Sequence, residues 1–151
     1  MQINSFTKEK EWIKSSIEIV QSACNIDGII SIALSGGNTP KPLYQAVAKA
    51  KLPFDLIDFF EVDERYVPKD HEDSNTKMIF ENLIQNCSPH AFNYFDTSKE
   101  IHEALEEYGK LIPTAGFNLS ILGIGPDGHT ASIFPKSEAI KNEVKDRKSV
   151  V

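Results

Sequence analysis

An α/β domain built on a mainly parallel sheet is the fold class that this sequence predicts. Segments with helical apolar spacing alternate along the chain with short runs of apolar, often β-branched residues. Apolar runs without polar alternation are typical of strands that are buried on both faces. Helices between such strands supply the long crossovers that parallel pairing needs. Three loops rich in glycine, proline and charged residues leave predicted strands, and they carry the unusual residues of the chain.

The helices and strands can be placed from these patterns. We expect a helix over residues 8–24 and a buried strand over residues 29–34. A second helix is expected from Pro40 to about Lys51, with Thr39 as its N-cap. The remaining expected elements are a strand over 56–62, a helix from Ser74 to about Asn86, a strand over 92–95, a helix opened by a capping box at Thr97 and Glu100, a strand over 117–124, and a charged tail over 137–148 that fits a helix or a solvated loop.

Composition and charge exclude several classes of protein. The chain has 151 residues, of which 40% are hydrophobic and 25% charged, and we treat residues 1–151 as a single domain. Its formal net charge of −6 lacks the excess of Lys and Arg that nucleic-acid binding needs. No stretch approaches the roughly 18 apolar residues of a membrane span, and the N-terminus does not resemble a secretory signal. We expect a cytoplasmic protein that binds neither nucleic acid nor membranes.

The first unusual loop follows a buried strand and reads Ser35-Gly36-Gly37-Asn38-Thr39-Pro40. Two glycines let the backbone turn sharply and approach a ligand closely. The N–H groups at the start of the next helix then favour a bound phosphate, and two hydroxyl groups add donors. A strand-to-helix turn in which Thr39 only caps the helix explains the pattern equally well. The glycine spacing matches neither a Walker loop nor a dinucleotide-binding fingerprint.

The second loop begins with three charged residues, Asp63-Glu64-Arg65, at the end of a predicted strand. The Arg65 guanidinium is a planar fork that suits a phosphate or a carboxylate. Asp63 and Glu64 are candidates for acid–base groups or for partners that orient Arg65. Taken alone, a charged run in a loop is more often solvated surface.

The third loop, residues 123–135, surrounds Asp127 and His129 with glycine and proline. A neutral histidine can take a proton from water near pH 7. Asp127 is a candidate to hold the histidine in one tautomer, although the spacing leaves open whether the two side chains touch. The alternative is a rigid turn with a capping aspartate and a surface histidine.

The other histidines and the cysteines do not indicate a site. His71, His90 and His102 lie in an acidic run, a turn and a helix rich in glutamate, all of which favour surface positions. Cys24 and Cys87 are expected to be buried free thiols in a reducing compartment. No side chains have metal-ligand spacing, so we expect no metal. The absence of a Gly-x-Ser-x-Gly elbow disfavours a serine hydrolase.

Together, the three loops resemble the signature segments of 6-phosphogluconolactonases, in the same order and at fitting intervals. The similar segments are Ser35 to Pro40, Asp63-Glu64-Arg65 with Val67-Pro68 and Ser74-Asn75, and Gly123 to Pro135. The resemblance implies a Rossmann-like three-layer domain without a cofactor. It also implies hydrolysis of 6-phospho-D-glucono-1,5-lactone to 6-phosphogluconate in the pentose phosphate pathway, with this phosphosugar lactone as the small-molecule partner.

The same resemblance implies a role for each loop. His129 is expected to act as general base on the water that attacks the lactone, with Asp127 orienting the histidine or the water. The first loop and Arg65 are expected to hold the 6-phosphate, and backbone N–H groups of residues 125–130 to stabilise the oxyanion. The expected substrate-binding residues are Ser35, Gly36, Gly37, Asn38, Thr39, Asp63, Arg65, Gly125 and Gly128.

Two other functions stay open at this point. Glucosamine-6-phosphate deaminases have similar loops, but they resemble Asp-Glu-Tyr where this chain has Arg65, and they carry a glutamate at the position of Phe134. Both differences favour the lactonase. Because family members continue past the loop histidine, we expect the sheet to be incomplete at the C-terminus and to expose an edge. A non-catalytic phosphosugar-binding fragment is therefore the second alternative, and a homodimer or strand exchange would cover the edge.

Overall fold

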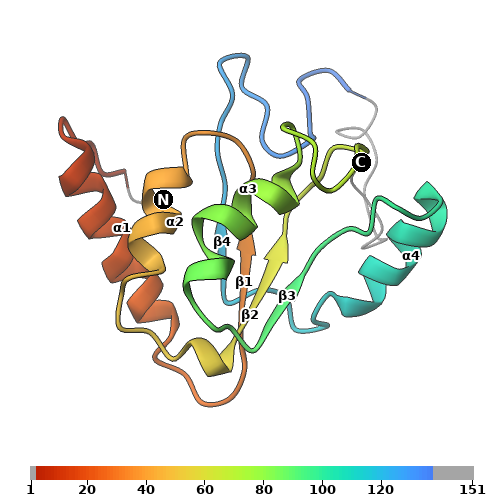
Figure 1. Ribbon diagram of the computed structural model, residues 1–151. Helices are drawn as coiled ribbons and strands as arrows, with labels where there is room; N and C mark the ends of the chain where they lie inside the picture. Colours follow the sequence, from red (N-terminus) through yellow and green to blue (C-terminus); the bar gives the residue numbers. More distant parts are fainter. Residues whose placement is uncertain (1–2, 138–151) are drawn as a thin grey trace.

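The computed structural model describes residues 3–137 and contains one parallel sheet with helices on both faces (Figure 1). The strands are β1 Ile30–Leu34, β2 Ile57–Glu61, β3 Ala91–Asn93 and β4 Leu119–Ile121. The helices are α1 Glu9–Ala23, α2 Lys41–Val47, α3 Asn75–Asn82 and α4 Ile101–Leu111, with the 3-10 turns η1 Phe54–Leu56 and η2 Ile84–Asn86. The expected α/β class and the parallel sheet are confirmed.

The strand order of the sheet is β3-β2-β1-β4. The chain therefore builds outward from β1 through β2 to β3, and then crosses back to place β4 on the other side of β1. In an open parallel sheet, loops diverge at such a reversal and leave a crevice beyond the carboxyl ends of the strands. The loops after β1 and β4 border this crevice, and the loop after β2 lies beside them.

Two clusters of apolar side chains hold the layers together. On one face, α1, α2 and α3 pack against β1 and β2 around buried residues such as Tyr44, Phe59 and Ile79. On the other face, α4 covers Phe60, and Tyr108 stacks on the Phe95 ring with a centroid separation of 3.8 Å. Phe59 and Phe60 are neighbours in β2 that point to opposite faces, as strand geometry requires. The result is the expected three-layer, Rossmann-like arrangement.

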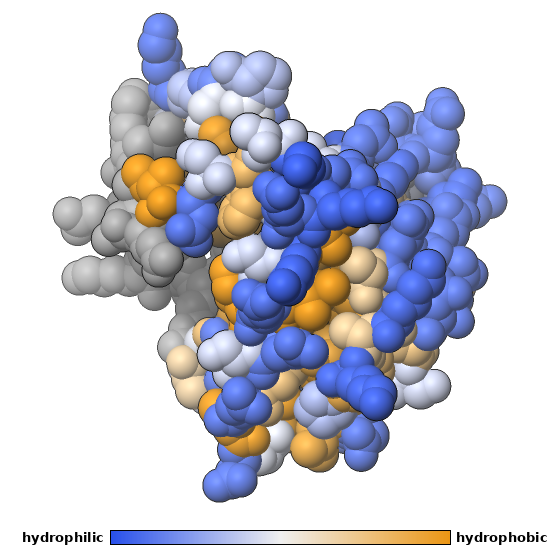
Figure 2. All heavy atoms as spheres, turned by 90° about the vertical axis from the view of Figure 1, so that its left-hand side faces the viewer, coloured by the Kyte–Doolittle hydropathy of each residue, from blue (hydrophilic) through white to orange (hydrophobic). Residues whose placement is uncertain are grey.

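Strand β4 lies at the edge of the sheet, because within the described residues it pairs with β1 alone. Exposed apolar side chains follow it: Leu122 is 53% exposed and Ile124 is 83% exposed. Figure 2 views the molecule from the side of Figure 1 on which α1 lies, and shows hydrophobic residues between hydrophilic ones on that face. The expected exposed edge is thus present in the part of the chain that the structure describes.

Two expected helix starts are wrong, and both have a local cause. Thr39 makes no capping hydrogen bond, since Pro40 occupies the N-cap of α2, and this helix ends early at Val47. The proposed capping box at Thr97 is replaced by Glu100, whose side chain accepts hydrogen bonds from the first-turn N–H groups of α4. The expected cap of α3 is confirmed, because Ser74 Oγ accepts a hydrogen bond from the backbone N–H of Lys77. The tail over 137–148 lies almost wholly outside the described residues.

A buried acid, Glu61, ends strand β2. Its side chain is 2% exposed, and its Oε2 accepts a hydrogen bond of 3.0 Å from the backbone N–H of Phe95. The other carboxyl oxygen, Oε1, is also buried, and the Thr76 side chain lies close enough to the carboxyl group to lower its pKa in part. Burial, reinforced by the charges of Glu64 and Asp63, raises the pKa of Glu61 to about 8. The sequence pattern predicts Glu61 inside a strand and indicates no role for it.

The raised pKa of Glu61 predicts a specific dependence of stability on pH. The folded state holds this proton more tightly than the unfolded chain, in which the pKa of the group is close to its ordinary value of 4.5. The free energy of unfolding should therefore decrease as pH rises from about 4.5 to about 8, by about 1.4 kcal/mol for each unit of pKa difference. Glu61→Gln, which stays neutral, should lose this slope in urea unfolding curves. The same slope in wild type and variant, with exposed Glu81→Gln as control, would contradict the assignment.

Candidate functional site

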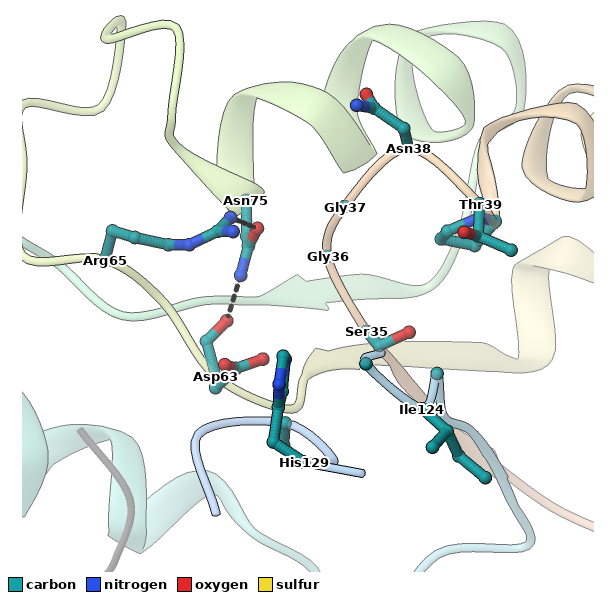
Figure 3. Close-up of a pocket in the computed structure, with 14 residues that line it drawn as sticks. Ser35, Gly36, Gly37, Asn38, Thr39, Asp63, Arg65, Asn75, Ile124 and His129 are labelled. Atoms are coloured by element: carbon teal, nitrogen blue, oxygen red, sulfur yellow. Dashed lines mark hydrogen bonds between the residues drawn. The ribbon is translucent and has the colours of Figure 1, made fainter. Parts of the chain in front are cut away.

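A pocket of about 220 Å³ lies beyond the carboxyl ends of β1, β2 and β4 (Figure 3). It occupies the point where the strand order reverses, which is where open parallel sheets bind ligands. The three loops singled out from the sequence and the first residue of α3 form its walls. The lining residues are Ser35, Gly36, Gly37, Asn38, Thr39, Pro40, Asp63, Arg65, Asn75, Gly123, Ile124, Gly125, His129 and Ala131.

Nine of the eleven site residues expected from the sequence line this pocket; the other two, Asp127 and Gly128, lie behind His129. Gly128 has a φ of +87°, a conformation that glycine adopts without strain, and its N–H closes a turn onto the Gly125 carbonyl at 2.9 Å. The lining residues that sequence analysis left without a role are Pro40, Asn75, Gly123, Ile124 and Ala131. All five lie within the segments that resemble the family's signatures, but none was expected to contact the substrate.

His129 and Asp127 are in direct contact. The His129 Nδ1 atom lies 2.5 Å from Asp127 Oδ1, and the His129 backbone N–H donates to the same oxygen at 3.2 Å. The hydrogen bond from the histidine side chain and that from its backbone hold the pKa of Asp127 below its usual range. An ionised carboxylate can only accept, so this contact favours the neutral tautomer of His129 that carries its proton on Nδ1. Nε2 is then left with a free lone pair.

The His129 ring packs closely against Gly125, over the position that a Cβ atom would occupy. A Cβ atom added at Gly125 would overlap the ring atoms Cε1 and Nδ1, so no other residue fits beneath the ring in this position. The N–H of Gly125 also donates to the His129 carbonyl at 2.8 Å. The Phe134 ring lies beside the imidazole, with a centroid separation of 4.8 Å. Figure 3 shows the His129 side chain rising between Asp63 and the Ser35–Gly36 segment.

The backbone N–H groups of the histidine loop are already engaged. Those of Gly125, Gly128 and Thr130 donate to backbone carbonyls, and that of His129 donates to the Asp127 side chain. The expectation that this loop supplies the donors for an oxyanion stays a prediction, and these four groups would have to leave their present acceptors to fulfil it. In contrast, the N–H groups of Gly36, Gly37 and Asn38 donate to no other group in the described part of the chain.

Glu64 does not line the pocket, but it holds the backbone of residues that do. Its carboxylate is 7% exposed and accepts four hydrogen bonds of 2.7–2.9 Å. The donors are the backbone N–H groups of Arg65, Asn75 and Thr76 and the hydroxyl group of Ser74. A carboxylate in this place satisfies N–H groups at the start of α3 that have no partner within the helix. This arrangement gives Glu64 a structural role and removes it as a candidate acid or base.

Arg65 reaches the pocket with its charge unpaired. Its Nη1 donates to Asn75 Oδ1 and, at 3.2 Å, to the Asp73 carbonyl, and both acceptors are neutral. Among the described residues Arg65 forms no ion pair with a carboxylate, although Asp63 lines the same pocket. The Asp63 carboxylate instead accepts a hydrogen bond of 2.6 Å from Ser132 Oγ, which ties the histidine loop to the end of β2.

Outside the pocket, the residues that sequence analysis set aside behave as ordinary structural groups. Cys24 and Cys87 are free thiols as expected, but both are half-buried instead of fully buried. Burial raises the pKa of Cys87 to about 11, so this thiol stays protonated near neutral pH. Residues 3–137 contain no group of three His, Cys, Asp or Glu side chains that could hold a metal ion. None of the helices in the same range is long and apolar enough to cross a membrane.

Known sequences resemble this chain over most of its length. The model of the family described as glucosamine-6-phosphate isomerases/6-phosphogluconolactonase matches residues 9–151. A 6-phosphogluconolactonase of Thermotoga maritima is 47% identical over 109 residues, which cover 70% of this chain and 50% of that relative. One from Nostoc sp. is 39% identical over 140 residues, which cover 85% of this chain and 58% of that relative.

Solved structures agree with the sequences. The crystal structure of the Thermotoga maritima 6-phosphogluconolactonase superposes with a TM-score of 0.77 at 38% identity, covering 85% of this chain and 62% of that one. The Trypanosoma brucei enzyme gives a TM-score of 0.80 at 32% identity, with 93% and 65% covered. This chain thus spans between 50% and 65% of the length of these relatives. By sequence and by fold, the chain belongs to the glucosamine-6-phosphate isomerase/6-phosphogluconolactonase family.

Proposed function

We propose that this protein hydrolyses 6-phospho-D-glucono-1,5-lactone to 6-phosphogluconate. One observation carries the proposal: a single pocket combines Arg65 and the glycine loop with a histidine whose Nδ1 contacts a carboxylate. The relatives named 6-phosphogluconolactonase support the same reaction. The chemistry needs water as its only co-reactant, so no cofactor enters the proposal.

The phosphate is assigned to the part of the pocket between Arg65 and the loop after β1. The Arg65 guanidinium is a fixed positive charge without an ionic partner in the described residues, and guanidinium groups bind phosphate through paired N–H donors. The N–H groups of Gly36, Gly37 and Asn38 are free to donate across from it. In Figure 3 the Arg65 side chain and the Gly36–Asn38 segment lie on opposite sides of the Asn75 side chain. Binding of the phosphate would then hold the lactone in one orientation, which supplies part of the rate.

His129 is assigned the role of general base. Its Nε2 would take a proton from a water molecule as the water oxygen bonds to the lactone carbonyl carbon. The tetrahedral intermediate then collapses, the bond between the carbonyl carbon and the ring oxygen breaks, and the ring oxygen receives the proton from the imidazolium. Asp127, in contact with Nδ1, stabilises the imidazolium between these two steps.

The apolar neighbour of His129 supports a lactonase over a deaminase. Phe134 places an aromatic ring 4.8 Å from the imidazole ring, at the position where the resemblance to deaminases would require a glutamate. Ring opening and loss of an amine need additional acid–base groups, which a phenylalanine does not supply. Lactone hydrolysis needs one base, one water and stabilisation of charge.

Removal of the imidazole should abolish turnover but preserve binding. His129→Ala is expected to lower kcat by about 10²- to 10⁴-fold, the usual contribution of a general base, while the affinity for 6-phosphogluconate stays close to wild type. Lactone disappearance after subtraction of spontaneous hydrolysis measures the first quantity, and calorimetry measures the second. His102→Ala, on the outer surface of α4, serves as control. A variant that retains full turnover would exclude His129 as the base.

A matched pair of glycine substitutions tests the contact between Gly125 and the His129 ring. Gly125→Ala introduces a Cβ that overlaps the ring, whereas Gly123→Ala, in the same loop and lining the same pocket, meets nothing within 4 Å. We expect Gly125→Ala to lower kcat at least about 10-fold, because an error of about 1 Å in a catalytic group has effects of this size. Gly123→Ala should stay near wild type. Equal activities of the two variants would show that the ring position does not matter for catalysis.

A further inference from the structure

Asn75 is a buried amide at the centre of the site. It is the first residue of α3, it lines the pocket, and it is 2% exposed. Its backbone N–H donates to Glu64 Oε1 at 2.7 Å, so that the buried carboxylate fixes its position. A buried amide is costly unless its oxygen and nitrogen both find partners. The partners of this amide therefore indicate what it does.

The oxygen and the nitrogen of the Asn75 side-chain amide both form hydrogen bonds (Figure 3). Oδ1 accepts a hydrogen bond from Arg65 Nη1, and Nδ2 donates to the Asp63 carbonyl at 2.8 Å. Only the oxygen can accept from a guanidinium and only the nitrogen can donate to a carbonyl, so the orientation of the amide is determined. The side chain thus connects the charged end of Arg65 to the rigid end of β2.

The Asn75 side chain also packs against the backbone of the loop after β1, at Gly36. A Cβ atom added at Gly36 would overlap Oδ1, Cγ and Nδ2 of Asn75. Gly36 does not belong to the glycines with positive φ, unlike its neighbour Gly37 with φ +88°. Its backbone conformation is therefore open to alanine, and the steric reason for glycine at this position is the Asn75 amide.

We propose that Asn75 is a positioning residue that holds Arg65 and the Gly36 loop in one arrangement for binding the phosphate of the substrate. The neutrality of the amide is part of this role. An amide oxygen orients the guanidinium without cancelling its charge, whereas a carboxylate at the same place would form an ion pair with Arg65 and repel a phosphate. The choice of phosphate as ligand rests on the proposed function, but the coupling between Asn75 and Gly36 does not.

A double-mutant cycle tests the coupling without any ligand. Gly36→Ala alone should lower the unfolding midpoint by several degrees, because it forces Asn75 out of place. In an Asn75→Ala background the clash is gone, so the same substitution should have little further effect. Asn82→Ala, at the far end of α3 with a hydrogen bond to Gln45, is a matched control in which the effect of Gly36→Ala should remain complete. Additive midpoints for Gly36 and Asn75 would overturn the proposal.

Binding measurements test the role in phosphate recognition. The probes are 6-phosphogluconate and gluconate, which differ by the phosphate, titrated into wild type, Asn75→Ala, Asn75→Asp and Arg65→Ala. We expect Asn75→Ala to reduce affinity for 6-phosphogluconate about 10-fold and Asn75→Asp to reduce it as much as Arg65→Ala, with gluconate unaffected. Equal losses for both ligands, or an Asn75→Asp variant that binds better than Asn75→Ala, would overturn the positioning role. A wild-type chain that does not distinguish the two ligands would count against the proposed function, while the unfolding cycle still decides the coupling.

Discussion

The buried carboxylate of Glu64 organises the site, because it joins the end of β2 to the beginning of α3. Its four hydrogen bonds fix the backbone of Arg65 on one side and the first turn of α3 on the other. Removal of one partner from such a buried, charge-assisted network leaves other groups unsatisfied at considerable cost. The chain between these two points, residues 66–73, is thereby closed into a loop whose ends cannot move apart. Arg65 and Asn75 face each other because of this closure.

Asp63 connects the other parts of the site to the junction of β2 and α3 that Glu64 stabilises. Its backbone carbonyl accepts from Asn75 Nδ2, and its carboxylate accepts from Ser132 Oγ in the histidine loop. The loop after β1 is held from the other side, since the buried Tyr44 hydroxyl donates to the Ser35 carbonyl at 2.7 Å. Hydrogen bonds therefore join the loops after β2 and β4, and the loop after β1 meets them where Gly36 packs against the Asn75 amide. A fixed arrangement of this kind is what pre-organised binding and catalysis require.

The fold was largely predictable from the sequence, because apolar periodicity reports burial directly. The strand runs, the parallel sheet and the three loops beyond its carboxyl edge all followed from that signal. The reasons for individual residues were not predictable, since they depend on partners that only the fold brings together. A glycine is required at position 36 because the Asn75 amide occupies the space of a Cβ atom. The sequence indicates loop surface or an acid–base group for Glu64, because the helix start that it binds, at Asn75 and Thr76, is 11 and 12 residues away along the chain. The capping box at Thr97 failed because Glu100 reaches the same helix turn by itself.

The central claim is that a phosphosugar lies across the pocket, with its phosphate at Arg65 and its carbonyl carbon at His129. A crystal structure of the protein with 6-phosphogluconate tests this most directly. The account predicts phosphate oxygens within hydrogen-bond distance, about 2.7–3.2 Å, of the Arg65 guanidinium and of N–H groups in residues 36–38, with the carboxylate carbon beside His129 Nε2. A phosphate bound outside this pocket, or a ligand lying in the opposite direction with its phosphate at His129, would contradict it.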